Sequence, residues 1–416
     1  MTHPRARARG QLARSAGWFG LAGLLACRNT DVGGGATGAA ESGSSSAASE
    51  ANASEASQSG DSESGSASWS SSDTGVSCNP EMPPLALQVL RDSPMGIISS
   101  FDMDLDRRPD AVGGRGVIVL DRGDGTEVRA LEHALAANDG MPGDFVDGGL
   151  PDLMFKPGVG EEFLVFSNAA EDISSSGIGS YGPSSWSADS EDFDGDGVDD
   201  VALALDGGDT VGLWRGQGDG SFNAGPEISG LQTPVVALVR YGMGGRVHLA
   251  LTPTFEEVAI YEIVADALLE VDGFPLLGVS TMADLDAFGN GDHGIFASWW
   301  FAGDLQVRSG VGVLLREPDD WVGFAHDLGG EVPVDQVPVD LDQDGDLDIV
   351  VAVAQEGGHR IDLACLQDDG YMLCGRIPLD VEPVNLGVLV DPPRLLLSTS
   401  SSTWLAELPE PACAAG

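Results

Sequence analysis

From about residue 81 onward, short apolar runs alternate with polar turns along the whole chain. The runs are rich in valine, leucine and isoleucine, and the turns are rich in glycine and aspartate. Residues 201–205 read Val-Ala-Leu-Ala-Leu, and residues 349–353 read Ile-Val-Val-Ala-Val. No long segment shows the 3.6-residue period of an amphipathic helix. The pattern predicts short β-strands and an all-β fold.

A nine-residue acidic loop precedes each of these two runs. Residues 192–200 read Asp-Phe-Asp-Gly-Asp-Gly-Val-Asp-Asp, and residues 340–348 read Asp-Leu-Asp-Gln-Asp-Gly-Asp-Leu-Asp. Both place aspartate at loop positions 1, 3, 5 and 9 and glycine at position 6. Alternating carboxylates around a glycine turn suit a hard cation with oxygen ligands. The loops therefore predict calcium sites at the start of β-strands.

Related loops recur and reveal a repeat. Residues 102–110 keep all four acids but have Arg107 at the glycine position, and residues 144–152 keep only positions 1 and 9. Residues 284–292 keep part of the pattern, and we interpret the irregular spacing there as an insertion. Two further units lack the acids. The seven marks lie 42 to 56 residues apart, near residues 102, 144, 192, 239, 284, 340 and 386.

This spacing predicts the architecture. Seven units of about 48 residues, each with four short strands, are typical of a seven-bladed β-propeller. We place it at residues 81–416 and expect residues 84–90 to supply the strand that closes the ring.

The N-terminal part has a different composition. Residues 1–26 combine a basic start with an apolar stretch too short to span a bilayer, as in a signal peptide. Leu24-Leu25-Ala26 followed by Cys27 resembles the bacterial lipobox, which implies lipidation of Cys27 and anchoring to the cell envelope, at the outer membrane or cell surface. Ordinary secretion is the alternative. Residues 27–80 are mostly serine, glycine, alanine and glutamate, which predicts a disordered tether.

The net charge of −46 restricts the partners. Such an acidic surface repels nucleic acid and anionic lipid headgroups, so we expect no nucleic-acid partner and membrane contact only through the lipid anchor. The charge suits an extracellular protein that requires calcium; acidity that serves solubility alone is the alternative.

The five cysteines suggest two disulfides in addition to Cys27. If Asp369-Gly370 forms a two-residue turn, Cys365 lies opposite Cys374 at a position where a disulfide fits. Cys78 and Cys413 flank the repeat array, and a bridge between them would staple the closed ring.

The acidic loop, the strand after it and the period together resemble the FG-GAP (VCBS-like) repeat of the integrin α-subunit propeller and of many bacterial surface proteins. In that family the aspartates and the main-chain carbonyl at loop position 7 bind calcium. The implied ligands are Asp192, Asp194, Asp196, Val198 (carbonyl) and Asp200; Asp340, Asp342, Asp344, Asp346 (carbonyl) and Asp348; and Asp102, Asp104, Asp106, Arg108 (carbonyl) and Asp110.

Two details qualify the resemblance. Arg107 lacks the conformational freedom of glycine and places a cation near the metal, which weakens the site at residues 102–110. An EF-hand is excluded because loop position 12 is Leu203 or Val351, inside a predicted strand, where that motif needs glutamate and a helix.

The resemblance implies a calcium-stabilised, monomeric binding or adhesion module at the cell surface, which recognises a protein or glycan at one rim of the propeller. Calcium would tie the loops without acting on a substrate. A polysaccharide lyase or hydrolase on the same scaffold is one alternative, and a structural component of an envelope complex is another. No catalytic motif stands out in the sequence, so we predict no enzyme activity.

Overall fold

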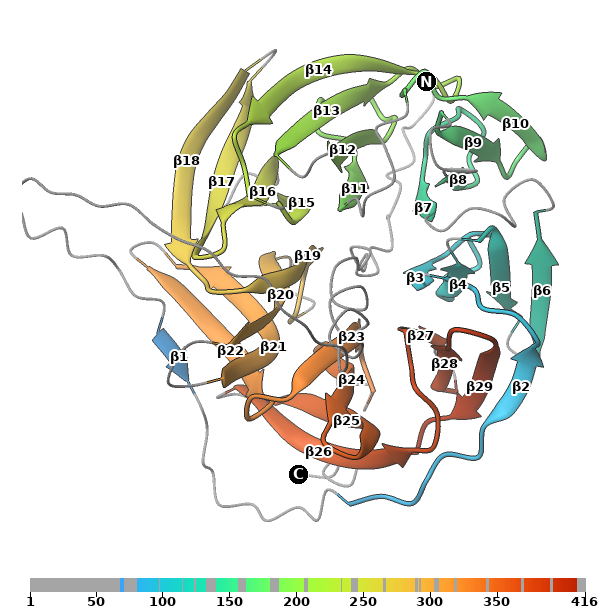
Figure 1. Ribbon diagram of the computed structural model, residues 1–416. Coiled ribbons are helices and arrows are strands. Elements are labelled where there is room, and N and C mark those ends of the chain that lie inside the picture. Colours follow the sequence, from blue (N-terminus) through green and yellow to red (C-terminus); the bar gives the residue numbers. More distant parts are fainter. Residues whose placement is uncertain are drawn as a thin grey trace, which may run out of the picture.

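The computed structural model describes residues 68–70 and 81–409, except residues 97, 114, 123–124, 132–139, 156–161, 180–186, 206–208, 233, 241–245, 265–266, 289–290, 292, 303–306, 318–319, 342–343, 368–369 and 390–391. The described residues form seven sheets arranged in a ring, each with four antiparallel strands, and one sheet gains a short fifth strand that pairs in parallel (Figure 1). The prediction of an all-β, seven-bladed β-propeller is therefore confirmed. No helix in this part of the chain could cross a membrane.

Each blade is a meander whose strands follow one another outward from the centre. The strands are, blade by blade, β3 (Ile98–Phe101), β4 (Asp110–Gly113), β5 (Val117–Asp121) and β6 (Thr126–Ala130); β7 (Gly140–Gly143), β8 (Asp152–Phe155), β9 (Leu164–Ser167) and β10 (Asp172–Ser175); β11 (Ala188–Glu191), β12 (Asp200–Ala204), β13 (Thr210–Gly216) and β14 (Phe222–Ser229); β15 (Val236–Arg240), β16 (Val247–Thr254), β17 (Glu257–Val264) and β18 (Ala267–Pro275); β19 (Val279–Leu285), β20 (Gly294–Ala302), β21 (Val307–Arg316) and β22 (Trp321–Asp327); β23 (Val332–Val339), β24 (Asp348–Gln355), β25 (Gly358–Gln367) and β26 (Gly370–Leu379); and β27 (Asn385–Leu389), β28 (Arg394–Ser398) and β29 (Thr403–Glu407), with β2 (Gln88–Arg91) as the fourth strand of blade 7.

The core lies between the blades. Seven clusters of buried side chains each join two neighbouring blades, and together they complete the ring. The second strand of a blade packs on both neighbours: Val201 contacts the cluster shared with blade 2, and Ala202 the cluster shared with blade 4. This explains why the second strands are continuous apolar runs, because both of their faces are buried.

The ring is closed by the N-terminal part of the propeller. Strand β2 pairs antiparallel with β29, so residues far apart in sequence complete blade 7. The predicted closing strand at residues 84–90 is confirmed, although the strand covers Gln88–Arg91. Cys78 and Cys413, whose predicted disulfide would staple this closure, lie outside the described residues, as does the predicted lipidation site Cys27.

Three residues of the predicted tether form a strand. Ser68–Ser70 (β1) pairs in parallel with β22, the outer strand of blade 5 (Figure 1). The prediction of an unstructured tether is wrong at these residues. An outer strand offers unpaired main-chain N–H and C=O groups, and pairing with them does not need an apolar sequence.

The predicted register of the hairpin in blade 6 is also wrong. Gln367 pairs with Gly370, and Cys365 therefore lies opposite Met372 and not opposite Cys374. A bulge follows, because Ala364 pairs with Leu373 and Leu363 with Gly375. Both cysteines are buried thiols, and the Sγ of Cys374 donates a hydrogen bond to the Met372 carbonyl at 3.3 Å. The cross-strand register from which the disulfide was predicted is therefore not the register of this hairpin.

Candidate metal centre

All of the acidic loops connect the first strand of a blade to its second strand. The loop 192–200 follows β11 and ends on the first residue of β12, and the loop 340–348 has the same place between β23 and β24. Since every blade repeats the same strand order around the ring, these loops emerge on one face of the disc, near its centre (Figure 1). The fold therefore places acidic loops that are distant in the sequence on the same face of the ring.

The aspartate at loop position 9 is a buried main-chain clamp in four blades. One oxygen accepts a hydrogen bond from the N–H of loop position 2, and the other accepts one from the end of the third strand or the residue after it. In blade 3, Asp200 accepts from Phe193 at 3.0 Å and from Gly216 at 2.9 Å. The other three clamps are Asp110 with Met103 and Asp121, Asp152 with Phe145 and Asn168, and Asp348 with Leu341 and Leu366.

Burial dominates the electrostatics of these clamps. It raises the pKa of Asp110 and Asp200 to about 7 and that of Asp152 to about 6, even though the N–H donors favour the charged form. These carboxylates are therefore held in the fold at an electrostatic cost, which a nearby cation would offset.

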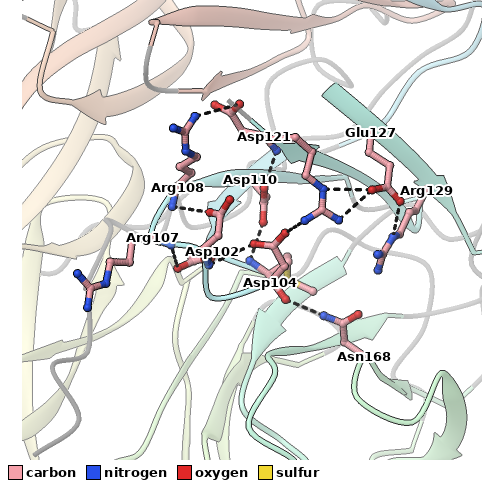
Figure 2. Close-up of polar contacts among 12 residues, drawn as sticks. Asp102, Asp104, Arg107, Arg108, Asp110, Asp121, Glu127, Arg129 and Asn168 are labelled. Atoms are coloured by element: carbon pink, nitrogen blue, oxygen red, sulfur yellow. Dashed lines mark hydrogen bonds and ion pairs between the residues drawn. The ribbon is translucent and has the colours of Figure 1, made fainter. Parts of the chain in front are cut away.

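The loop of blade 1 gathers three of its predicted ligands. Asp102, Asp104 and Asp106 each place one carboxylate oxygen within 4.8 Å of the others. Figure 2 shows Asp102 and Asp104 side by side in this loop. The main-chain N–H of Arg107 donates to Asp102 at 2.9 Å. Burial, and then the negative charges of Asp106 and Asp104, raise the pKa of Asp102. The fourth predicted acid, Asp110, is the buried clamp.

The loop of blade 3 gathers a slightly different set. Asp192, Asp194 and Asp200 place one oxygen each within 4.8 Å of one another. Gly197 donates its N–H to Asp192 at 3.0 Å, as Arg107 does to Asp102 in blade 1. Here the clamp carboxylate itself belongs to the acidic group.

The aspartate at position 5 is oriented by the main chain in three loops. Its Oδ1 accepts a hydrogen bond of 2.9 Å from the N–H of position 7 in each loop. These contacts join Val198 to Asp196, Arg108 to Asp106, and Asp346 to Asp344. The three predicted carbonyl ligands thus belong to residues whose N–H groups already fix the neighbouring carboxylate, while their role as ligands remains a prediction.

The loop of blade 6 is described in part, because Asp342 lies outside the described residues. Asp340 has a buried Oδ1 with no hydrogen-bond partner among the described residues. A buried carboxylate oxygen without a donor is costly, and a cation is one partner that would satisfy it. Among the described residues, this loop does not bring three acids together as closely as the other two loops do.

An arginine approaches position 3 in both gathered loops. Arg122 pairs with Asp104 in blade 1 and also with Glu127, at 2.8 Å. In blade 3 the Nε of Arg215 lies 3.7 Å from Asp194. These contacts compete with a metal for the same carboxylates, most directly in blade 1.

Position 6 of the loop is in the left-handed region. Gly197 and Gly345 have φ values of 97° and 100°, and Arg107 takes φ 76° at the corresponding place. A side chain is strained in this region. The positive φ at this position confirms the expectation that the turn favours glycine. In blade 1 the turn is strained, because Arg107 adopts this conformation with a side chain.

The blade 2 loop is held by protein contacts in place of a full set of acids. The N–H of Asp199 in blade 3 donates to the Asp144 carbonyl at 2.8 Å, and the carboxylate of Asp199 accepts the N–H of Asp144 at 2.9 Å. Asp147 donates its N–H to the Gly218 carbonyl at 2.9 Å. Main-chain bonds from blade 3 thus stabilise a loop that lacks acids at positions 3 and 5.

The insertion predicted in the blade 5 loop is wrong. Leu285 pairs with Gly294, as Glu191 pairs with Asp200, so the loop runs from Asp286 to Gly294 and has the usual nine positions. Gly291 occupies position 6 with φ 88° and donates its N–H to Asp286 at 3.0 Å. The acid at position 9 is replaced by glycine, so this loop has no clamp of the kind seen in the other blades.

Two features of this face were missed by the sequence reasoning. Asp284 belongs to β19, where it accepts the N–H of Arg240 at 3.0 Å and contacts the Nδ1 of His293 at 2.7 Å, which raises the pKa of His293. The second missed feature is the arginine that contacts the aspartate at loop position 3. Neither has a signal in the loop motif, since the partners come from other strands or another blade.

No family model and no curated protein matches this sequence. Among solved structures, the chain is similar to the N-terminal domain of Nup159, with 7% sequence identity, 78% of this chain and 98% of that chain covered, and a TM-score of 0.41. The fold assignment rests on the seven sheets and their order around the ring.

Proposed function

We propose that this protein is a calcium-stabilised binding module of the FG-GAP type, which is exported and anchored to the bacterial cell envelope through Cys27. The observation that carries the proposal is the close grouping of three carboxylate oxygens in each of two equivalent loops on one face of the propeller. Such a set of hard oxygen donors suits calcium better than a softer metal.

The residues present fit the ion. In blade 3, the site would take Asp192, Asp194, Asp196, Asp200 and the Val198 carbonyl; in blade 1, Asp102, Asp104, Asp106 and the Arg108 carbonyl. The buried Oδ1 of Asp340, which has no hydrogen-bond partner among the described residues, supports a further site in blade 6. Calcium would neutralise the acids that repel one another and would stabilise the inner rim of the disc.

The propeller scaffold is consistent with binding. Loops carried on a rigid ring are a common place for recognition, and the calcium loops would fix the shape of one rim. We propose that a protein or a glycan binds at this rim, and that the calcium ions support the binding surface without forming it.

The metal is tested by calorimetric titration of the chelator-treated full chain with calcium, and with magnesium for comparison. We expect calcium binding at two or three sites. The variant Asp192→Asn/Asp194→Asn removes one site. Asp147→Asn, in the loop of blade 2, is the matched control and leaves the number of sites unchanged. No heat of binding from calcium would overturn the metal assignment.

The binding role is tested on a glycan array and by capture of envelope proteins, in calcium and in chelator. Retention of a ligand that is lost in chelator supports the proposal. Turnover of a polysaccharide, abolished by an acid-to-amide change outside the loops, would identify an enzyme. Stable recovery in one envelope complex, independent of any glycan, would identify a structural component.

A further inference from the structure

We propose that the outer edge of blade 5 is a strand-accepting surface, and that residues Ser68–Ser70 of the same chain are its built-in occupant. The contact is the parallel pairing of β1 with β22 (Figure 1). In its register, Trp69 pairs with Gly323. This inference concerns the outer circumference of the disc and does not depend on calcium binding at the inner face.

The outer edge of a blade is chemically suited to this role. A fourth strand pairs on one side with the third strand and leaves a row of main-chain donors and acceptors on the other. In β22, Val322, Gly323 and Phe324 pair with β21 on one side and with β1 on the other. Added strands bind mainly through such main-chain hydrogen bonds, and the side chains that meet across the pair supply specificity.

The sequence of the occupant points to the same contact. Residues 28–77 contain one aromatic residue, Trp69, in a background of serine, glycine, alanine and acids. That residue is at the centre of the three-residue strand, and its register partner is a glycine, which presents no side chain of its own. Aromatic residues favour strands, whereas the surrounding composition does not. The one aromatic residue of this segment is therefore the residue that pairs.

The direction of the chain supports the contact independently. Glu81 forms a parallel bridge with Arg376 in β26, and the N–H of Met82 donates to the Arg376 carbonyl at 2.9 Å. Strands β22 and β26 are both fourth strands and run in the same sense, so the N-terminal chain is parallel to the outer edges of blades 5 and 6 alike. It then completes blade 7 as β2.

Met82 shows how specific this edge contact is at blade 6. A Cβ added to Gly375 would meet the Met82 Sδ at 2.6 Å, so the thioether lies directly over the glycine in β26. Three successive blades therefore bind the N-terminal chain on their outer edges, at Ser68–Ser70, Glu81–Met82 and Gln88–Arg91. The chain approaches the propeller at blade 5, two blades before the one that it closes.

The test is hydrogen–deuterium exchange of the full chain, read at the amides of Val322–Phe324 that do not pair with β21. Trp69→Ser should increase their exchange about tenfold, because the added strand then opens more often. Trp69→Ser combined with Ser59→Trp keeps the composition of the segment, and the exchange should stay fast. Exchange in β25, which has partners on both sides, reports on the fold and should not change.

The occupant is distinguished by light scattering over a range of protein concentrations. Protection of these amides in a monomer, independent of concentration, supports pairing within one chain. Protection that appears only with dimer formation would overturn this and assign the occupant to a second copy. Equal exchange in the wild type and in Trp69→Ser would show that β1 does not occupy the edge.

Discussion

The stability contributed by the clamp at loop position 9 can be measured apart from that contributed by calcium, by comparing variants of Asp152 and Asp200. Each is 0% exposed and accepts three main-chain N–H groups. Only the loop of Asp200 brings three acids together. Replacing either residue by alanine removes the same kind of clamp, whereas only Asp200→Ala also removes a proposed calcium ligand.

The magnitude follows from the hydrogen bonds. A hydrogen bond to a charged group contributes about 1.5 kcal/mol or more, so three of them amount to roughly 4.5 kcal/mol or more. Part of this is regained because burial of the carboxylate is unfavourable, and we expect each variant to lose roughly 3 kcal/mol in chelator. For a domain of this size that corresponds to a fall in Tm of roughly 4 °C.

Calcium should then separate the two variants. At a free calcium concentration about 100 times Kd, one site stabilises the native state by about 2.7 kcal/mol. Asp152→Ala keeps the whole of the calcium-induced stabilisation, so its deficit relative to the wild type is unchanged. Asp200→Ala loses one site, and its deficit grows to about 6 kcal/mol, the clamp and one site together.

The assay is thermal and urea unfolding of the wild type and both variants, in calcium and in chelator. Asp147→Ala, an exposed acid of the blade 2 loop, is the control and should resemble the wild type in both conditions. If neither variant is less stable than the wild type in chelator, the clamp does not stabilise the fold. An equal loss of calcium stabilisation in both variants would refute the metal site in blade 3.

Three further substitutions test other parts of the structure. Arg107→Gly should raise the free energy of unfolding in chelator by about 1 kcal/mol, because the residue has positive φ; no gain in urea unfolding would argue against strain. Burial raises the pKa of Asp335 to about 7, so the native state binds a proton more tightly than the unfolded chain, and the stability that this group contributes falls as the pH rises from about 4 to 7. Asp335→Asn should flatten that part of the pH–stability curve, and an unchanged slope would contradict the assignment. Arg360 is buried and bonds Asp362 at 2.7 and 2.9 Å, so Arg360→Ala should cost about 3 kcal/mol or more in urea unfolding, whereas Arg129→Ala at the surface should cost below about 1 kcal/mol; similar losses would show that the buried cluster is not distinctive.

The sequence predicted the ring because two signals repeat with the blades. The continuous apolar run is the second strand, buried on both faces, and the acidic loop before it marks its first residue. Both signals depend on local sequence, so they identify each blade without knowledge of its neighbours. Closure by the N-terminal strand followed from the need of a ring to complete its last blade.

The predictions that were wrong depend on details of backbone pairing that leave little signal in the sequence. The blade 6 hairpin turns one residue earlier than the Asp369-Gly370 motif suggests, and a bulge near Cys374 shifts the pairs beyond it. A shift of one residue exchanges every cross-strand pair, so the cysteine pair was lost. Aligning the blade 5 loop on Asp284 instead of on Gly291 produced the false insertion. Strand β1 pairs through its main chain, which composition does not report.

The acids of the loop serve two separate purposes, and this decides how many metal sites to expect. Asp152 forms a complete clamp in a loop that lacks acids at positions 3 and 5, so an acid at position 9 is explained by the main chain alone. In that loop, the contacts with Asp199 bind the backbone. The acids at positions 1, 3 and 5 do not hold the buried main chain in this way, and without a cation their negative charges repel one another. They are therefore the better indicator of calcium, and all three are present in blades 1, 3 and 6 alone.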